Sequence, residues 1–511
     1  MGETAIRKIL IVGGGTAGWI TAAALSALYA KKALKIELVE SEAIGTVGVG
    51  EATVPHIRFF NDRIGVDERA FMLKTAATFK LGIEFRDWGR IGDSYVHPFG
   101  DFGRPVGGVK FHQLWRRLQD SGAPGSIFDY SLPVRLATQG RFAKPSTETG
   151  AMGATYSYAY QFDASLYAAY LRELSVSRGV TRHEGRITQV VQDPISGFVQ
   201  SVALEDGRRL EADLFIDCSG FRGLLIEETL KSGYEDWSQW LPCDRAWAAP
   251  CAAAEPGGAY TRATAREAGW QWRIPLQHRV GNGYVYSSAN VSDTDALDDL
   301  LAKTGEKPLA DPRFLRFVTG RRKRFWNRNC VALGLASGFL EPLESTSIHL
   351  VMSSVYNLLD RFPDKSFDQS NIDAYNRELI DEIEHIRDFI VLHYCTTQRN
   401  DAPLWSYCQS MSLPDSLLER IEIYKGTGRV RPKAGELFTD LSWFYIFEGM
   451  GVEPRGYDPL ADVISDGQLR GILGEFARAT AASVKAAPSH DSYFPAPLDQ
   501  AATRRLGAAA Q

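Results

Sequence analysis

The chain has few cysteines, no histidine ligand pattern and no long apolar run. Its 511 residues include six cysteines without C-x-x-C spacing, which predicts reduced thiols and no metal site. Nine histidines show no H-x-x-x-H pattern. The sequence also lacks a stretch of about 18 uncharged apolar residues, so no membrane span is predicted. The first predicted strand begins so near the N-terminus that a signal peptide is not expected. These absences predict a cytoplasmic protein.

An excess of positive charge is also lacking. The net charge is −5, with 23% charged and 44% hydrophobic residues, as is usual for a soluble enzyme. This balance argues against a nucleic-acid partner or a polybasic contact with membranes. We expect a monomer or a homodimer. The chain is long enough for the hydrophobic cores of two or three domains. Eleven tryptophans and 26 phenylalanines suit a pocket for an aromatic ligand, although most of them are expected to fill the core.

Residues 9–18, ILIVGGGTAG, form the most informative stretch. An apolar strand runs into a G-x-G-x-x-G turn at Gly13, Gly15 and Gly18, and an alanine-rich helix follows. The turn residues, which include Thr16 and Ala17, present backbone N–H groups to a pyrophosphate. A second strand over residues 35–39 ends at Glu40, whose carboxylate can accept hydrogen bonds from a ribose. The stretch therefore predicts FAD or NAD binding.

A glycine-punctuated loop over residues 45–55 follows, and its glycines allow close approach to a flat ligand. Gly50, Glu51 and Ala52 of this loop are expected near the cofactor. The sequence has a single dinucleotide fingerprint, whereas two would be expected for a chain that binds both FAD and NADPH. The chain is therefore predicted to receive its reduced flavin from elsewhere, or to hold a flavin that it cannot reduce.

The remaining pattern predicts an α/β (mixed α+β) fold. We expect helices over residues 56–90, an irregular substrate-facing insertion over 91–160, and a helix over 163–177. Strands are expected over 185–202 and 210–217, in an antiparallel pair at 270–275 and 283–288, and at 329–335 before a helix through 359. An amphipathic helix is expected over 371–395, with short helical pieces beyond 400 and a loose tail over 485–511. The predicted domains are a Rossmann-like three-layer body with a second antiparallel sheet (1–370), a helical cap that contributes to the substrate pocket (371–490) and a tail (491–511).

Three motifs resemble those of one enzyme family. They are GGGTAGW at residues 13–19, WQWRIP at 270–275 and GFLEPLESTSI at 338–348. Together they are similar to the flavin-dependent halogenases of the tryptophan-halogenase type, and the resemblance extends over most of residues 5–360. It implies an enzyme that uses FADH2, supplied by a separate flavin reductase, with O2 and chloride or bromide to halogenate a small aromatic substrate.

The resemblance also implies site residues. Lys80, in TFKLG, matches the lysine at the end of a tunnel from the flavin, and Glu344 matches the acid that faces it across the substrate. Thr346 and Ser347 match the halide site. The further expected site residues are the flavin contacts Ile187, Leu335 and Ile348, the gating pair Trp270 and Trp272, and the substrate contacts His97, Phe99, Phe111, Trp443 and Phe447.

Chemistry supports these roles. Hypohalous acid is indiscriminate in water and needs a walled path to one ring carbon. Lys80 can hydrogen-bond this acid or react with it as an amine, and burial readily shifts a lysine pKa. Glu344 can stabilise the cationic arenium ion or remove its proton. Backbone N–H groups in a turn suit a halide, and His349 is expected to serve packing.

Two departures from the family pattern bear on ligands. Gly334 and Leu335 stand where many flavoproteins carry Gly-Asp, so one polar flavin contact is missing. The free-tryptophan enzymes carry a clamp for the amino acid near their C-terminus, which residues 442–449 do not clearly match. Indole or an indole derivative is therefore expected in preference to free tryptophan.

Two other functions fit part of this pattern. A flavin-dependent aromatic monooxygenase, which hydroxylates its substrate, would share the fingerprint and the second sheet but has no use for Lys80. A non-catalytic flavin-binding redox protein would not need a halide turn at Thr346 and Ser347. The products formed from an indole panel would separate the three functions.

Overall fold

The structure is a computed structural model of the whole chain. It describes residues 4–29, 34–43, 50–120, 122, 125–147, 155–252, 258–305, 307–431 and 433–494. Gly50, Glu51 and Ala52 are among these residues, whereas the first part of the predicted glycine loop, residues 45–49, lies outside them.

The chain forms two compact units, each assembled from three segments. Unit 1 comprises Met1–Ala77, Phe162–Gln239 and Arg316–His385. Unit 2 comprises Thr78–Gln161, Trp240–Leu315 and Ile386–Gln511. This division does not test the predicted boundaries at residues 370 and 490, which stay predictions.

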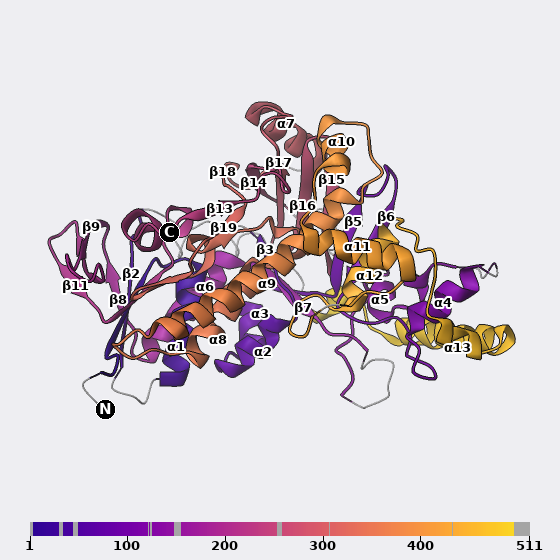
Figure 1. Cartoon of the computed structure of the whole chain (residues 1–511), viewed down its shortest axis with the longest axis horizontal. Coiled ribbons are helices and arrows are strands. Elements are labelled where there is room, and N and C mark those ends of the chain that lie inside the picture. The colour runs from indigo at the N-terminus through magenta and orange to yellow at the C-terminus, as the bar shows by residue number, and fades with distance from the viewer. Residues whose placement is uncertain are drawn as a thin grey trace. The chain divides into compact units, whose positions relative to one another are not determined.

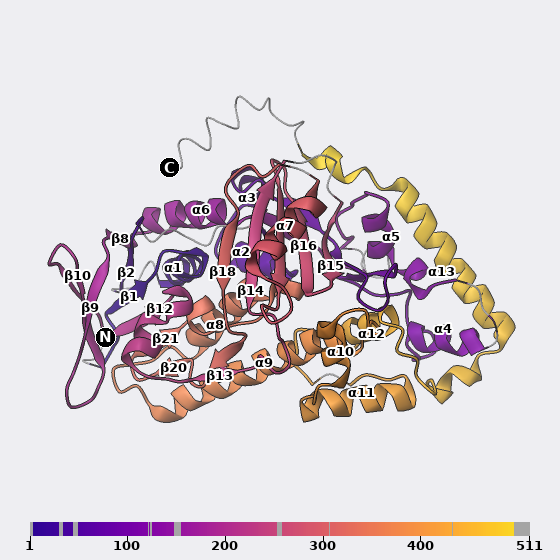
Figure 2. The ribbon, with the colours of Figure 1, turned by 90° about the horizontal axis from the view of Figure 1, so that it is seen from above.

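A six-stranded sheet forms the centre of unit 1, in the order β20-β21-β12-β1-β2-β8 (Figure 2; β2 and β8 are also labelled in Figure 1). Its strands are β1 (Lys8–Val12), β2 (Lys35–Glu40), β8 (Thr181–Glu184), β12 (Leu214–Asp217), β20 (Trp326–Asn327) and β21 (Cys330–Ala332). All neighbours pair in parallel except β20 and β21, which are antiparallel. Strands buried on both faces read as continuous apolar runs. The predicted strand–helix–strand start and the parallel sheet are therefore confirmed.

Helices pack in layers beside this sheet, and α1 (Thr16–Tyr29) contacts β1 and β2 directly. The others are α2 (His56–Arg63), α3 (Glu68–Lys74), α6 (Ala164–Ser177) and α8 (Ser347–Asp360). Helix α1 contacts both α6 and α8 and lies between them in Figure 2. Asp163 caps α6 by accepting hydrogen bonds from the N–H groups of Ser165 and Leu166, which explains why the predicted helix begins there. Helix α9 (Gln369–Cys395) confirms the predicted long amphipathic helix, and its residues up to His385 belong to unit 1.

Two small sheets and several short helices complete unit 1. One sheet has the order β11-β10-β9 and the other β13-β19-β22. Their strands are β9 (Ile187–Gln192), β10 (Val199–Leu204), β11 (Arg209–Glu211), β13 (Tyr234–Asp236), β19 (Gly320–Arg322) and β22 (Gly338–Phe339). The short helices are η3 (Gly220–Arg222), η4 (Leu224–Thr229), η5 (Gly334–Ala336) and η6 (Pro342–Glu344), and β3 (Gly50–Ala52) also lies in this unit.

Unit 2 is built on a seven-stranded sheet in the order β18-β14-β17-β16-β15-β5-β6. The strands are β5 (Gly82–Arg86), β6 (Ser94–Pro98), β14 (Arg245–Cys251), β15 (Tyr260–Arg266), β16 (Gly269–Pro275), β17 (Val280–Tyr286) and β18 (Arg313–Arg316). β14, β17, β16 and β15 form successive antiparallel pairs, as do β5 and β6, whereas β15 and β5 are parallel. The predicted second, largely antiparallel sheet with WQWRIP on one strand is confirmed.

The prediction of helices throughout residues 56–90 is wrong beyond Lys74. Ala76 has a positive φ of 50°, which ends helical geometry after α3. β4 (Thr78–Lys80) then pairs antiparallel with β7 (Ala159–Asp163), and β5 joins the seven-stranded sheet. Leu73, an apolar residue of α3, is 61% exposed. Lys80 therefore lies on a buried strand and not on a helix.

Helices surround the sheet of unit 2. They are α4 (Phe111–Asp120), η1 (Ile127–Tyr130), α5 (Leu132–Thr138), α7 (Asp293–Thr304), α10 (Pro403–Ser410), α11 (Asp415–Thr427), α12 (Asp440–Gly449), η7 (Pro459–Val463), α13 (Asp466–Ala486) and η8 (His490–Tyr493). α13 lies beside α4 (Figure 2). The loose tail predicted from residue 485 is wrong at its start, because Ala487 and His490 are buried. In the described part of the chain, no helix is both long and apolar enough to cross a membrane.

Candidate active site

The glycine turn of unit 1 has the geometry of a nucleotide cradle. Gly13 has a φ of 111°, and a Cβ on it would lie 2.3 Å from the Cys218 carbonyl oxygen. A Cβ on Gly18 would lie 1.9 Å from the Gly13 oxygen, so only glycine fits at either position. A Cβ on Gly15 would meet no atom within 4 Å, so the turn opens onto free space just before α1 begins at Thr16. This cradle fits a pyrophosphate at a helix N-terminus.

Glu40 ends β2 beside this turn. A Cβ on Gly14 would lie 1.5 Å from Glu40 Oε2, so the carboxylate rests directly on the glycine backbone. Trp19 Nε1 donates to Glu40 Oε2 at 3.2 Å, and Arg182 Nε donates to Oε1 at 2.5 Å. The acid is thus fixed beside the glycine turn, and its predicted contact with a ribose hydroxyl stays a prediction.

The other predicted flavin contacts of unit 1 lie on separate elements. A Cβ on Gly334 of η5 would lie 2.7 Å from Ala17 and 3.6 Å from Val351, so η5, the nucleotide turn and α8 meet there. Leu335 is the next residue of η5, and Ile348 lies buried in the first turn of α8. By contrast, Ile187 pairs with Leu204 at the start of β9 and packs against the core cluster beneath that sheet.

Burial raises the pKa of the Glu51 carboxyl, on β3, to about 7. Glu51 can therefore hold a proton at neutral pH, when an ordinary glutamate is ionised. Its neighbours Gly50 and Ala52 are buried in the same strand. A flavin role for all three residues stays a prediction.

The start of α8 lacks the usual side-chain cap. Thr346 is the N-cap residue and is fully buried, yet its hydroxyl accepts no capping hydrogen bond. Its Oγ1 has no hydrogen-bond partner in the described part of the chain. A threonine at this position ordinarily accepts from an N–H of the first turn. The first N–H groups of α8, from Ser347 onward, are therefore left for an anion.

Glu344 precedes this helix start and closes η6. Its side chain is buried, with 1% exposure, and the next residue, Ser345, adopts a left-handed φ of 59°. The tight turn thus sets the acid two residues before the anion-suited helix start.

Lys80 is 0% exposed on β4 of unit 2, where it pairs with Ala159 of β7. Its Nζ lies 5.2 Å from the centre of the Phe99 ring, within reach of a cation–π contact. The structure therefore brings together two predicted site residues, Lys80 and Phe99. Glu344 belongs to unit 1, and its meeting with Lys80 in one pocket stays a prediction.

His97, on β6, is 2% exposed and belongs to an aromatic cluster. Its ring centre lies 5.5 Å from that of Phe389 and 6.1 Å from those of Phe438 and Tyr445. We call these four residues the His97 cluster. The sequence interpretation missed the last three, although Tyr445 belongs to the aromatic run of α12 that was considered for the substrate.

Trp443 of α12 packs edge-on against Phe389 at 4.9 Å. The Arg420 guanidinium lies 4.1 Å above the Trp443 ring and makes two hydrogen bonds to the Glu436 carboxylate, at 2.8 and 2.9 Å. Asp440, at the start of α12, forms an ion pair with Lys110. Each of these two carboxylates near the cluster thus has a cation beside it.

Phe111 and Phe447 lie in helix-packing contacts. Phe111 of α4 packs edge-on against Phe476 of α13 at 5.2 Å, and Phe447 of α12 stacks on Tyr424 of α11 at 4.0 Å. Both side chains are buried. Their predicted contact with substrate stays a prediction.

The two tryptophans of WQWRIP are buried in β16. Their ring centres are 6.2 Å apart, and Trp270 lies 6.5 Å from Trp88. Trp272 covers Gly283 of β17, since a Cβ there would lie 2.0 Å from the indole. The pair is therefore rigidly packed, as a barrier requires, and its gating role stays a prediction.

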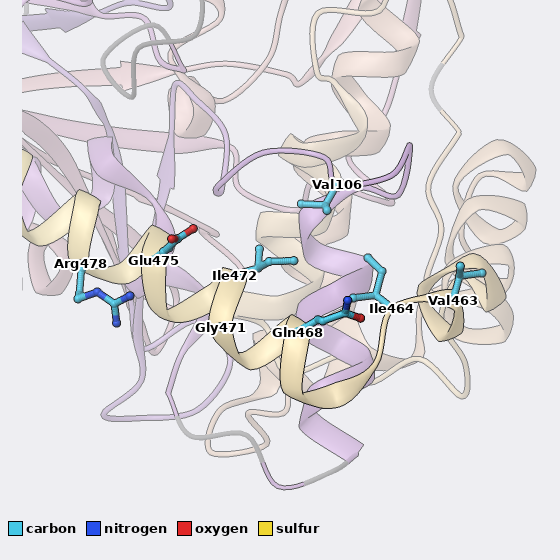
Figure 3. Close-up of a pocket in the computed structure, with 8 residues that line it drawn as sticks. All are labelled: Val106, Val463, Ile464, Gln468, Gly471, Ile472, Glu475 and Arg478. Atoms are coloured by element: carbon cyan, nitrogen blue, oxygen red, sulfur yellow. The ribbon is translucent and has the colours of Figure 1, made fainter.

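A cavity of ≈ 630 Å³ lies elsewhere in unit 2, along α13 (Figure 3). Its lining comprises Val106, Val463, Ile464, Gln468, Gly471, Ile472, Glu475 and Arg478. None of these residues was predicted to be in the site, and Val463 is 82% exposed. This cavity is a surface groove apart from Lys80 and the His97 cluster.

Comparison with known proteins agrees with this geometry. The family model of tryptophan halogenases matches residues 8–466. Tryptophan 6-halogenase ThaL of Streptomyces albogriseolus is 34% identical over 490 residues, which are 89% of this chain and 91% of the relative. The flavin-dependent halogenase Xcc4156 from Xanthomonas campestris has a TM-score of 0.93 at 45% identity, covering 97% of this chain and 100% of that chain. BrvH, a flavin-dependent halogenase from Brevundimonas sp. BAL3, has a TM-score of 0.92 at 42% identity, covering 96% and 99% of the two chains. The chain belongs to the tryptophan halogenase family of flavin-dependent enzymes, which use FADH2 and halide.

Proposed function

We propose that this enzyme halogenates an indole derivative other than free tryptophan and passes the oxidised halogen through Lys80. Family membership establishes the halogenation reaction, the reduced flavin from a partner reductase and an aromatic substrate. The substrate class and the path of the halogen are the parts that we add. The observation that carries the proposal is the full burial of Lys80 beside Phe99, because a lysine without a function at this site would ordinarily reach solvent.

The chain's own residues fit the cofactor. Gly13, Gly15 and Gly18 would cradle the pyrophosphate of FAD, and Glu40 would hold its ribose. Bound reduced FAD supplies, with O2, the oxidising power that turns halide into hypohalous acid. The uncapped start of α8 at Thr346 and Ser347 would hold the halide, since buried N–H groups at a helix N-terminus favour an anion.

Lys80 would receive the halogen in a dry environment. As an ammonium it donates a hydrogen bond to hypohalous acid; as an amine it exchanges a proton for the halogen and releases water. Either form delivers an electrophilic halogen to a ring carbon. Burial excludes bulk water, into which the acid would otherwise escape and react elsewhere. Glu344 would then accept the proton that the ring loses as aromaticity returns.

The charges near the His97 cluster argue against free tryptophan. The ammonium of an amino acid needs a carboxylate partner when it is buried. Glu436 is engaged by Arg420, and Asp440 by Lys110. An amino-acid substrate that used either of these two acids would have to break its ion pair, whereas an indole without an ammonium needs only the aromatic walls.

A product assay tests the proposal. The enzyme is incubated with a flavin reductase, FAD, NADH, O2 and bromide, together with indole, simple indole derivatives or L-tryptophan, and products are identified by mass spectrometry. We expect monobrominated indoles and poor conversion of L-tryptophan. Tight binding of L-tryptophan with one clean brominated product would refute the substrate class. Hydroxylated products would indicate a monooxygenase, and flavin binding without any product would indicate a redox protein.

A further inference from the structure

Arg182 of β8 lies beside the predicted ribose acceptor Glu40 in unit 1. Strand β8 pairs in parallel with β2 (Figure 2), and Arg182 lies opposite Leu38, two residues before Glu40. Side chains two residues apart on a strand share a face, so the side chains of Arg182 and Glu40 point to the same side of the sheet. Leu38 on that side lies 3.6 Å from the position that a Cβ on Gly18 of α1 would take. This is therefore the side on which the nucleotide turn and α1 lie.

Two donors hold the Glu40 carboxylate, one on each oxygen. Arg182 Nε donates to Oε1 at 2.5 Å, and Trp19 Nε1 donates to Oε2 at 3.2 Å. Arg172 of α6 brings a second cation towards Oε1, but its Nη1 lies 3.9 Å away, beyond hydrogen-bond distance. An ionised carboxylate has about four acceptor positions, two on each oxygen. One position on each oxygen therefore remains, which matches the two donors of a ribose 2′,3′-diol.

The Arg182 guanidinium is itself held in place. Its Nη2 donates to Glu42 Oε1 at 3.0 Å and to Glu184 Oε2 at 2.8 Å. Glu184 Oε1 in turn accepts from the Glu42 N–H at 3.0 Å. The Gly185 N–H donates to the Glu40 carbonyl oxygen at 2.9 Å, so the ends of β2 and β8 are tied together. Because the planar guanidinium presents its donors as a rigid fork, rotation of Arg182 would break three hydrogen bonds at once.

This arrangement fixes Glu40 before a ligand arrives. A glutamate side chain that is free to rotate must be immobilised when it accepts hydrogen bonds from a ligand. Immobilising one such side chain lowers affinity roughly two- to tenfold. In unit 1 the carboxylate is already oriented by Arg182 and Trp19, so binding would not carry this cost.

We propose that Arg182 positions the Glu40 carboxylate for the adenosine ribose of FAD. This inference rests on the proposed function, which assigns the contact with that ribose to Glu40. Arg182 acts through Glu40 and is therefore a positioning residue. The two residues are 142 positions apart in the sequence, so the local pattern around the glycine turn does not reveal Arg182.

The test measures how strongly each protein variant depends on the two ribose hydroxyls. Flavin fluorescence gives the dissociation constants of the full chain for FAD and for an analogue whose adenosine lacks the 2′- and 3′-hydroxyls. We call the ratio of these constants, analogue over FAD, the diol factor. For the parent, the diol factor should be roughly 10- to 150-fold, the scale for hydrogen bonds to a charged group. Glu40→Ala removes the acceptor and should bring the diol factor near one.

Two variants of Arg182 test the positioning role. Arg182→Met removes every donor of the guanidinium but keeps an apolar side chain, which leaves Glu40 free to rotate. The diol factor should then fall roughly two- to tenfold below that of the parent, with weaker binding of FAD itself. Arg182→Lys keeps a cation near the same carboxylates but lacks the planar fork. Its diol factor should lie between those of the parent and the methionine variant.

The matched control is Arg208→Met. Arg208 lies at the same end of β8, where it pairs with Asp206 and donates to the Glu184 carbonyl oxygen. This variant removes a guanidinium that touches β8 but has Asp206 as its carboxylate partner, so the diol factor should equal that of the parent. Melting temperatures near that of the parent would show that the variants remain folded.

The outcomes separate this inference from the proposed function. If Glu40→Ala loses the diol factor but both Arg182 variants keep it, Arg182 has no positioning role and the ribose contact of Glu40 stands. Arg182 variants that bind FAD and the analogue more weakly in equal proportion would also overturn the inference, because they would indicate a structural effect. If the parent binds FAD and the analogue equally well, the ribose contact of Glu40 and this inference both fall, whereas the path of the halogen through Lys80 is untouched.

Discussion

Replacement of Lys80 tests the path of the halogen. Lys80→Met keeps a side chain of similar length on β4 but removes the nitrogen. Because Lys80 is fully buried, Lys80→Ala would also leave a cavity, and truncations of this kind cost about 2–5 kcal/mol of stability. Lys80→Met avoids most of that cost, although it loses the contact with Phe99, worth up to about 2 kcal/mol. We therefore base the prediction on the methionine variant.

Lys80→Met should uncouple flavin oxidation from ring halogenation. Hypohalous acid would still form at the proposed halide turn, but it would decay or escape instead of being passed on. Halogenated product per flavin oxidised should fall roughly 10²- to 10³-fold, the scale for loss of a positioned catalytic group. The assay measures product by mass spectrometry and flavin oxidation by absorbance in the same samples.

The matched control is Lys74→Met, which alters an exposed lysine of α3 that pairs with Glu173. This variant should keep the parent ratio of product to oxidised flavin. If Lys80→Met, with a melting temperature near that of the parent, also keeps that ratio, the halogen does not pass through Lys80 and the reasoning is wrong.

Three further predictions concern other parts of the chain. Glu344→Gln should slow halogenation roughly 10²- to 10³-fold with FAD affinity unchanged, as titration and turnover would show; a parent rate would remove Glu344 from the chemistry. Gly13→Ala should abolish FAD binding, measured by flavin fluorescence, because the new Cβ would meet the Cys218 oxygen at 2.3 Å; retained affinity would contradict the cradle. Burial, partly offset by Arg116, raises the pKa of Glu448 to about 7, so its ionisation destabilises the fold as pH rises from about 4.5 through 7. Glu448→Gln should therefore raise stability at pH 8 by about 1–2 kcal/mol and leave it unchanged at pH 4, and equal melting temperatures at pH 8 would contradict this.

The start of the fold follows from local sequence, because each signal there has a local cause. The apolar run of β1, the glycine positions and the acid that ends β2 depend on neighbours within 40 residues. The error at β4 and β5 has an equally local explanation. Phe79, Leu81, Ile83 and Phe85 alternate with period two, which favours strands. The prediction of helices over residues 56–90 overlooked this short alternation.

The remaining site features depend on tertiary packing. His349 and Glu382 lie 33 residues apart on two helices, and neither helix alone predicts their hydrogen bond. Phe389 stacks on Phe438 at 3.7 Å, although Phe438 precedes α12 and Phe389 lies within α9. Residue types suggested an aromatic pocket, but side-chain packing decides which rings meet around His97.

Ser345 holds a conformation that a residue with a Cβ seldom adopts. Its φ of 59° and ψ of 37° cost roughly 1–2 kcal/mol of free energy relative to glycine. The packing of the surrounding core must offset this cost. The backbone between Glu344 and Thr346 is thus strained in the folded protein. Glycine here would relieve the backbone strain, but it would also allow larger thermal fluctuations of the turn. In an enzyme that handles a reactive oxidant, a rigid turn at this position helps to confine that oxidant.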